Sequence, residues 1–205
     1  MTFESVFRRK APGAPHWGSY FRLIPLEFVG TPLSAIGSIA SGGRYNTRSD
    51  FEALYLADRP DNSLREVRML RDDAGFPIAV PAAPRIIFTV DVRLQRVVDL
   101  TDDSVCALFG VSFDELIAPW RLIVALGRVP TTHALGAAAR NVGVEALIVP
   151  SAQHPGSRNL VVMPDRLLLG SSVRIHRPRG FAADVGVTIE GAVAHRRRSV
   201  ARRRR

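Results

Sequence analysis

The order of the predicted elements is the feature that most limits how this sequence can fold. Short apolar or alternating segments, typical of strands, and helical segments follow one another irregularly, and no internal repeat is visible. A doubly wound parallel sheet requires a regular alternation of strands and helices, so this order favours an α+β fold. Strands are predicted at residues 19–26, 51–60, 85–93, 96–100, 144–151, 159–165 and 171–178.

Four segments have the pattern of helices. The clearest in the first half has Leu64, Val67 and Leu70 on one face. Polar residues at the segment ends are typical helix caps. These are Asp61 or Asn62 for residues 61–75, Asp102 or Asp103 for 102–110, and a capping box of Ser112 and Glu115 for 112–120. Residues 131–143 are Ala-rich, with Thr131 or Thr132 near the start and Gly143 past the end.

The two ends of the chain differ in composition from the body. Residues 1–18 are rich in Pro, Gly and charge, so we expect a flexible N-terminal arm. Residues 19–180 are long enough for one domain with a sizeable core. Residues 181–205 form a C-terminal extension, in which 186–193 are either an edge strand or irregular, and the Arg-rich end is expected to be disordered.

The formal net charge of +9 first suggests a nucleic-acid-binding protein. However, the last eleven residues contain seven arginines and no acidic residue. Subtracting those seven charges leaves +2 on the other 194 residues. The body of the protein is therefore nearly balanced, and its basic character belongs mostly to the tail.

Composition also excludes several classes of protein. The one cysteine, Cys106, cannot form an internal disulfide, and its apolar surroundings indicate a buried, inert thiol. No apolar run approaches the roughly 20 residues of a membrane span, and the N-terminus lacks the apolar core of a secretory signal. A cytoplasmic protein without membrane contact is the default expectation. No histidine pair has metal-ligand spacing, and no Rossmann, P-loop or nucleophile-elbow motif is present.

Two segments in the first third are candidates for ligand binding. In residues 42–46 the glycines, Gly43 among them, let the backbone approach a ligand closely, and Arg44 can form a forked contact with a phosphate. An isolated turn with an exposed arginine explains the same pattern. Tyr55 lies among apolar residues, where its ring either packs in the core or stacks on an aromatic ligand.

Two further residues are candidates on weaker grounds. Glu66 lies at the edge of an apolar helix face without an oppositely charged partner one turn away, although a solvated helix charge explains it equally. Ser151 ends an apolar strand and opens a loop rich in Pro, Gly and Asn, which is a common position for ligand contacts and also for a simple turn.

Taken together and in order, these segments resemble the RES domain family, named for its Arg, Glu and Ser. The resemblance runs from Phe21 to Arg166. It rests on FRL, GGRYN, ALYLAD, SLRE, the tryptophan at 120, THALGAAARNVGVEALIVPSA and NLVVM. By this resemblance the three family residues are Arg44, Glu66 and Ser151; Tyr55 matches the family's tyrosine and Arg22 a frequent basic position. The family helix more often opens with Thr-Gln, so His133 either touches the ligand or merely occupies the helix start.

The resemblance implies a fold, an activity and a partner. The fold is similar to that of ADP-ribosyltransferases such as diphtheria toxin, a mixed sheet core with flanking helices. Family members are toxins of bacterial type II toxin–antitoxin pairs and consume NAD by hydrolysis or phosphorolysis of the nicotinamide–ribose bond. NAD is then a substrate, with phosphate as a co-substrate in phosphorolysis, and no cofactor or metal is required. The partner is an Xre-like antitoxin with a helix-turn-helix, in a hetero-oligomeric complex that touches DNA through the antitoxin.

The residue types fit that chemistry. Departure of nicotinamide leaves positive charge on the ribose, which Glu66 can stabilise. Arg44, together with Arg22, would anchor the pyrophosphate or an incoming phosphate. Tyr55 would stack on nicotinamide or fix the ribose, and Ser151 would donate a hydrogen bond rather than act as a nucleophile, because no base lies near it in sequence.

Two other functions remain open from the sequence. Within the same fold, the ADP-ribose can be transferred to a cellular protein instead of water or phosphate. In a different class, a non-enzymatic nucleic-acid-binding protein would use the basic tail, whose arginines contact phosphates with a strong salt dependence.

Overall fold

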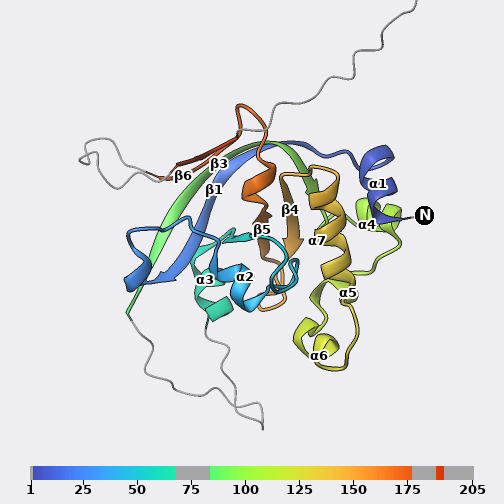
Figure 1. Cartoon of the computed structure of the whole chain (residues 1–205), viewed down its shortest axis with the longest axis horizontal. Coiled ribbons are helices and arrows are strands. Elements are labelled where there is room, and N and C mark those ends of the chain that lie inside the picture. Colours follow the sequence, from blue (N-terminus) through green and yellow to red (C-terminus); the bar gives the residue numbers. More distant parts are fainter. Residues whose placement is uncertain (1, 68–83, 177–187, 192–205) are drawn as a thin grey trace, which may run out of the picture.

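The computed structural model describes residues 2–67, 84–176 and 188–191. Its strands and helices follow one another irregularly, as predicted (Figure 1). The strands are β1 (Ala14–Pro25), β2 (Leu54–Ala57), β3 (Arg85–Asp99), β4 (Ala146–Pro150), β5 (Arg158–Val162), β6 (Ser172–Ile175) and β7 (Thr188–Glu190). The helices are α1 (Phe3–Arg9), α2 (Gly37–Ser41), α3 (Pro60–Val67), α4 (Asp103–Phe109), α5 (Phe113–Ile117), α6 (Trp120–Ala125) and α7 (Thr131–Asn141), with short 3-10 turns at Leu26–Phe28 and Pro164–Arg166.

The sheet is mixed and bends back on itself. Its order is β1-β2-β5-β4-β3-β6-β7, and β1 also pairs with β3, which closes a ring of five strands. The β3–β4 pair is parallel and the others are antiparallel. The long strands β1 and β3 arch behind β4 and β5, and α7 lies on the opposite side of these two short strands (Figure 1). The α+β class and the mixed sheet with flanking helices are therefore confirmed.

The ring and the helices enclose two hydrophobic cores, one on each face of the β2-β5-β4 strands. On β4, Leu147 and Val149 belong to the core beneath the helices, whereas Ala146 and Ile148 belong to the core shared with β1, β3 and β6. Alternate residues of a strand point to opposite faces, so a strand buried on both faces is apolar throughout. All five residues of β4 are buried, which explains its uninterrupted hydrophobic sequence.

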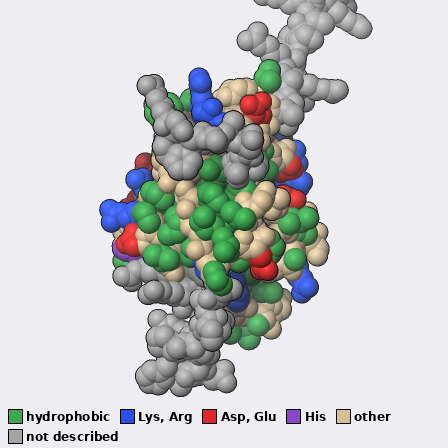
Figure 2. Space-filling model, turned by 90° about the vertical axis from the view of Figure 1, so that its left-hand side faces the viewer, with side chains coloured by type: hydrophobic (Ala, Val, Ile, Leu, Met, Phe, Trp, Pro, Cys, Tyr) green, Lys and Arg blue, Asp and Glu red, His purple; other side chains and the backbone are tan. Residues whose placement is uncertain are grey.

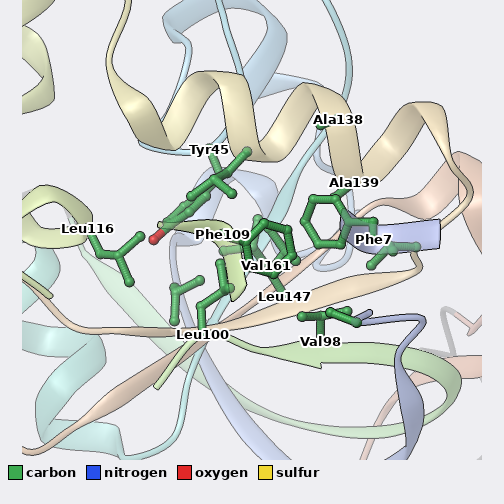
Figure 3. Close-up of a cluster of buried hydrophobic side chains, with 14 of the residues drawn as sticks. Phe7, Tyr45, Val98, Leu100, Phe109, Leu116, Ala138, Ala139, Leu147 and Val161 are labelled. Atoms are coloured by element: carbon green, nitrogen blue, oxygen red, sulfur yellow. The ribbon is translucent and has the colours of Figure 1, made fainter. Parts of the chain in front are cut away.

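The helix-side core joins segments far apart in the sequence. Figure 3 shows Phe7 from α1, Phe109 from α4 and Ala139 from α7 meeting over Leu147 of β4. The rings of Phe7 and Phe109 lie 4.5 Å apart between centroids, a distance typical of favourable aromatic pairs. Phe7 is completely buried, so residues 3–9 form a helix docked on this core where the sequence predicts a flexible arm. Burial of two apolar side chains stabilises this helix despite the Pro and Gly residues that flank it.

A buried carboxylate explains a second difference from the sequence. Residues 85–93 and 96–100 are predicted as two strands but form the single strand β3. Its neighbour changes from β6 at Arg93 to β4 at Val97, which leaves the backbone N–H groups between them without a strand partner on that side. Glu145 Oε2 accepts from the N–H groups of Gln95 and Arg96, both at 2.6 Å. The strand continues because this side chain replaces the missing strand.

The cap predictions are confirmed for two helices and wrong for α3, which begins at Pro60 and so contains Asp61 and Asn62. Asp102 caps α4, and Ser112 with Glu115 forms the capping box of α5. The apolar face predicted for the helix at residues 61–75 is wrong at Leu64, because that side chain is exposed. Asn62 and Ser63 are buried instead. Asn62 Nδ2 donates to the carbonyl of Arg158 in β5, which orients α3, whereas Ser63 Oγ donates to the carbonyl of Pro60 within the helix. Val67 and Leu70 have side chains outside the described part of the structure.

The remaining helix and strand predictions differ in extent. Helix α7 spans 131–141, with the predicted threonines at its start and Gly143 beyond its end. Helices α2 and α6 were not predicted, because each is a five- or six-residue helix without side-chain capping. Strand β7 shows that 188–190 form an edge strand against β6, inside the segment assigned to the C-terminal extension. The Arg-rich end, 195–205, lies outside the described residues.

Hydrophobic side chains also reach the surface. Figure 2 shows them gathered in the middle of one face of the molecule, with charged side chains around them. Among the most exposed are Trp17, Phe28 and Ile36 near β1 and the segment that follows it. Within the described ranges, none of the helices combines the length and hydropathy needed to cross a membrane.

Candidate active site

A cavity of about 1160 Å³ opens beside β1, where the ring of strands parts. Strand β1 pairs with β2 only at Phe21 and Ala57, so residues 22–25 continue without β2 alongside and form one wall. Helix α2 and the loop 42–45 form a second wall, and the segment 119–121 a third. Arg22, Arg44 and Arg121 line the cavity, and no carboxylate occurs among the lining residues that the structure describes.

The loop at the cavity is held by a buried amide and a tyrosine hydroxyl. Tyr55 Oη accepts from the N–H of Tyr45 at 2.8 Å and donates to Asn46 Oδ1 at 2.9 Å. Asn46, which is fully buried, donates through Nδ2 to the carbonyls of Ser38 and Phe51. The Tyr55 ring both lines the cavity and packs on the helix-side core. These bonds explain why a tyrosine follows the loop at this spacing.

Two glycines permit the close packing of this loop. A Cβ at Gly43 would lie 2.4 Å from Tyr55 Oη, and a Cβ at Gly136 of α7 would lie 1.8 Å from the carbonyl oxygen of Tyr45. Both distances are shorter than real carbon contacts allow, so any larger residue would push the loop away. The side chain of Tyr45 is buried beneath α7, with its hydroxyl pointing toward Leu116 (Figure 3).

Arg44 follows directly after Gly43, and its guanidinium reaches across the cavity to α5. Its Nη1 donates to the carbonyls of Leu116, at 3.3 Å, and Ala118. Carbonyl groups at a helix C-terminus carry partial negative charge and are suitable partners for an arginine. The guanidinium is thereby fixed at the point where α5 ends and the α6 segment begins.

Arg22 lies on the inward face of β1, between the buried side chains of Tyr20 and Ile24. Its Nη2 donates to the carbonyl of Ser34 at 2.6 Å. Its Nη1 is buried and has no hydrogen-bond partner among the described residues. Burial lowers the pKa of Arg22 to about 10, so the group stays cationic at neutral pH. A buried cationic donor without a partner at a cavity wall is suited to an anionic ligand.

Two comparisons relate this chain to known proteins. Residues 19–183 match the model of the RES domain. The chain belongs to the RES domain family. A search of the solved structures finds, among others, the crystal structure of the MbcT–MbcA toxin–antitoxin complex of M. tuberculosis, with a TM-score of 0.63 and 23% identity, over 78% of this chain and 80% of that chain. This likeness is one of fold. A search of the curated proteins finds no match.

The RES domain residues predicted from the sequence lie at two linked places. Arg22, Gly43, Arg44 and Tyr55 line the cavity. Ser151 lies just beyond the lining residue Pro150 and is buried. Glu66 belongs to α3, but its side chain lies outside the described part of the structure.

Ser151 connects its loop to the start of α3. Its hydroxyl donates to Asn62 Oδ1 at 2.9 Å and accepts from the N–H groups of Gln153 and His154. Asn62 Nδ2 in turn donates to the carbonyl of Arg158 and to Asn159 Oδ1. A serine at this position therefore holds the helix that carries Glu66 against β5.

His133 supports the cavity loop from behind. Its Nε2 lies 2.9 Å from the carbonyl oxygen of Gly43, and the residue is buried and absent from the cavity lining. Burial lowers the pKa of His133, partly offset by the bond to Gly43, so the neutral ring with a proton on Nε2 is the donor. In this structure the His133 ring lies at the start of α7 and contacts the carbonyl of Gly43.

Sequence reasoning missed several residues of the site. Asn46 stands inside the singled-out GGRYN segment, yet a buried asparagine cannot be distinguished there from a turn residue. Gly136 looks like an ordinary residue of an Ala-rich helix until the loop is placed against it. Trp120, which the sequence offers only as part of the family resemblance, and Arg121 line the cavity. The Arg121 guanidinium lies 4.4 Å from the centroid of the indole ring.

Proposed function

We propose that this RES domain protein is an NAD-consuming toxin of a bacterial type II toxin–antitoxin pair, which cleaves the nicotinamide–ribose bond by hydrolysis or phosphorolysis. The observation that carries the proposal is the cavity, with three arginines and no carboxylate in its described lining. Its volume of about 1160 Å³ is at the upper end of small-molecule sites and suits a dinucleotide. Membership of the RES domain family supports the same substrate.

In the proposed reaction the bond between the nicotinamide nitrogen and ribose C1 breaks. Nicotinamide leaves as a neutral molecule with the bonding electron pair, and an oxygen of water or phosphate bonds to C1. In hydrolysis the proton that the attacking water loses is released to solvent. Positive charge develops on the ribose during departure, and a carboxylate close to it stabilises that charge. Glu66 of α3 is the residue we propose for this role.

The arginines provide the anchor for the phosphates. Arg44 is fixed by the carbonyls at the end of α5, and Arg22 presents, on the β1 wall, a buried Nη1 without a hydrogen-bond partner in the described part of the chain. A planar guanidinium can donate two parallel hydrogen bonds to a phosphate. We assign the NAD pyrophosphate, or in phosphorolysis the attacking phosphate, to these two groups.

Tyr55, His133 and Ser151 act mainly as positioning residues in this scheme. Tyr55 and His133 both bond to the loop that carries Arg44, and Ser151 bonds to the helix that carries Glu66. Their effect on the reaction is therefore transmitted through the two charged groups.

The partner we propose is an Xre-like antitoxin with a helix-turn-helix, in a hetero-oligomeric complex whose DNA contacts come from the antitoxin. The similar fold of MbcT, which was solved in a toxin–antitoxin complex, supports such a pairing. The site of action would be the cytoplasm, where NAD is available. An antitoxin gene next to this one would support the pairing, and its absence would weaken the toxin role without affecting the NAD chemistry.

The test is to mix purified protein with NAD, with and without phosphate, and to identify products by mass. Free ADP-ribose indicates hydrolysis, ADP-ribose-1″-phosphate indicates phosphorolysis, and a labelled protein indicates ADP-ribosyl transfer. Folded Arg44→Ala, Glu66→Ala and Ser151→Ala variants should lose most or all NAD turnover, while Arg9→Ala, on the exposed surface of α1, should keep it.

A folded Glu66→Ala protein with near-normal turnover would overturn the site assignment. Deletion of residues 195–205 separates the enzyme from a tail-driven nucleic-acid binder: the enzyme keeps its turnover, whereas the binder loses its activity.

A further inference from the structure

The cavity contains an aromatic residue that the proposed chemistry does not use. Trp120 is the first residue of α6 and lines the cavity. Of the other three aromatic side chains in the described lining, Tyr45 is buried under α7, the Tyr55 hydroxyl holds the loop, and Phe28 is 53% exposed beside β1. An indole ring at the wall of a polar cavity is a common platform for a flat heterocycle.

The Trp120 ring is held in place by groups that belong to the phosphate site. Its centroid lies 5.4 Å from that of His133, at an interplanar angle of 53°. His133 contacts the carbonyl of Gly43, which precedes Arg44, and Arg44 donates to the carbonyl of Ala118, two residues before the tryptophan. The indole is therefore linked to the arginine loop on two sides.

Arg121 adds an exposed cation to this platform. Its guanidinium lies 4.4 Å from the indole centroid, it is exposed, and it lines the cavity. An exposed arginine on a tryptophan contributes only about 0.5–1 kcal/mol, so a ligand can displace it from the ring face without large cost. Displaced toward the cavity, the same guanidinium is a suitable donor to a phosphate attached to a stacked base.

We infer that Trp120 stacks on the adenine of the dinucleotide, with Arg121 at the adenosine phosphate. The inference rests on the proposed function, which places the cleaved ribose at Glu66 of α3. Helices α3 and α6 lie well apart (Figure 1), so the base at α6 is the one remote from the cleaved bond. Trp120 is then a substrate-binding residue that sets the affinity for the adenosine half.

The experiment uses Trp120 as its own reporter. The chain has two tryptophans, and the other, Trp17, is 74% exposed on β1 and outside the cavity lining. In the Trp17→Phe protein, AMP and ADP-ribose should quench the remaining fluorescence saturably, because a stacked purine quenches an indole. Nicotinamide mononucleotide, which has a phosphate but no adenine, should leave it unchanged at the same concentration.

A matched pair of variants gives the second measurement. Trp120→Ala should raise the dissociation constant for AMP and the KM for NAD about tenfold, since stacking of a base on an aromatic ring contributes about that much. Its kcat should stay within about threefold, because the cleaved bond lies at the other end. Trp120→Phe, which keeps a ring, should recover most of the affinity, and Trp17→Ala should change neither constant.

Quenching by nicotinamide mononucleotide in place of AMP, or unchanged AMP affinity in a folded Trp120→Ala protein, overturns the inference. Saturable quenching by AMP in a protein that consumes no NAD supports the adenine site and counts against the proposed function instead. NAD consumption without any effect of AMP on the Trp120 fluorescence supports the proposed function and counts against the adenine site.

Discussion

Two walls of the cavity differ in how they are stabilised. The loop 42–46 is anchored by buried hydrogen bonds from Tyr55, Asn46 and His133 and lies directly on α7. Helix α6, at the opposite wall, has no buried residue, and Leu122, Leu126 and the following Val129 are largely exposed. One wall is part of the protein core, whereas the other is a surface segment attached at its ends.

The two walls are therefore suited to two different tasks. Bond cleavage requires charged groups held in a defined geometry, and the core supplies this for the arginine loop. Recognition of a flat base tolerates small movements and needs little more than a ring at the cavity wall. We therefore expect changes on the loop side to affect both stability and turnover, and changes in α6 to affect affinity with little effect on stability.

The largest effect is expected from Gly136→Ala. Its Cβ would lie 1.8 Å from the carbonyl of Tyr45, so the loop must move away from α7. Overpacking of this kind costs roughly 1–3 kcal/mol or more, and we expect about 3 kcal/mol of unfolding free energy and most of the NAD turnover to be lost. Denaturant unfolding and turnover measure the two effects.

Gly30→Ala is the matched control, because a Cβ there meets nothing within 4 Å. Equal stability of the two variants would show that the loop does not depend on close contact with α7.

Tyr55→Phe should have the next largest effect. It leaves the N–H of Tyr45 and Oδ1 of Asn46 without their partner, which costs about 1–3 kcal/mol when such groups are buried. The ring that lines the cavity remains, so a loss of unfolding free energy together with a rise in the KM for NAD would show that the hydroxyl acts through the position of the phosphate anchor Arg44. A rise in KM without loss of stability would instead indicate direct substrate contact.

A smaller effect is expected at acid pH. Burial lowers the pKa of His133, so below its unfolded value of about 6.5 the unfolded chain binds a proton more readily than the folded protein. The stability contributed by the neutral ring is therefore complete above that pH and declines as the pH falls. His133→Gln, which keeps a donor for Gly43, should reduce this decline in pH-dependent melting; His16, whose pKa is also lowered by burial, retains its own share. If the pH dependence of melting were unchanged in His133→Gln, the stabilising role of the neutral His133 ring would be contradicted.

The smallest effect is expected in α6. Leu126 is 65% exposed, so Leu126→Ser should change the unfolding free energy by no more than about 0.5 kcal/mol. A loss of 2 kcal/mol or more would mean that this wall is part of the core, and the comparison of the two walls would fail.

Local patterns in the sequence were sufficient for most elements of the fold. The apolar segment of β4, the capping box of α5 and the Ala-rich α7 each carry their signal within a few neighbouring residues. The RES resemblance likewise depends on short segments in order, and it led directly to Arg22, Gly43, Arg44 and Tyr55 at the cavity. Short segments of sequence therefore predict whether the backbone is helical or extended, which side chains are buried and which chemistry they offer.

Only the tertiary structure decided what depends on distant segments. Glu145 joins two predicted strands into β3, Phe7 docks the N-terminal segment on the core, and Gly136 admits the arginine loop onto α7. None of these roles has a pattern in its own neighbourhood, because each partner lies tens of residues away along the chain. Trp120 belongs to the same class: as a residue it is merely aromatic, and it becomes a candidate platform because the ring of strands opens beside it.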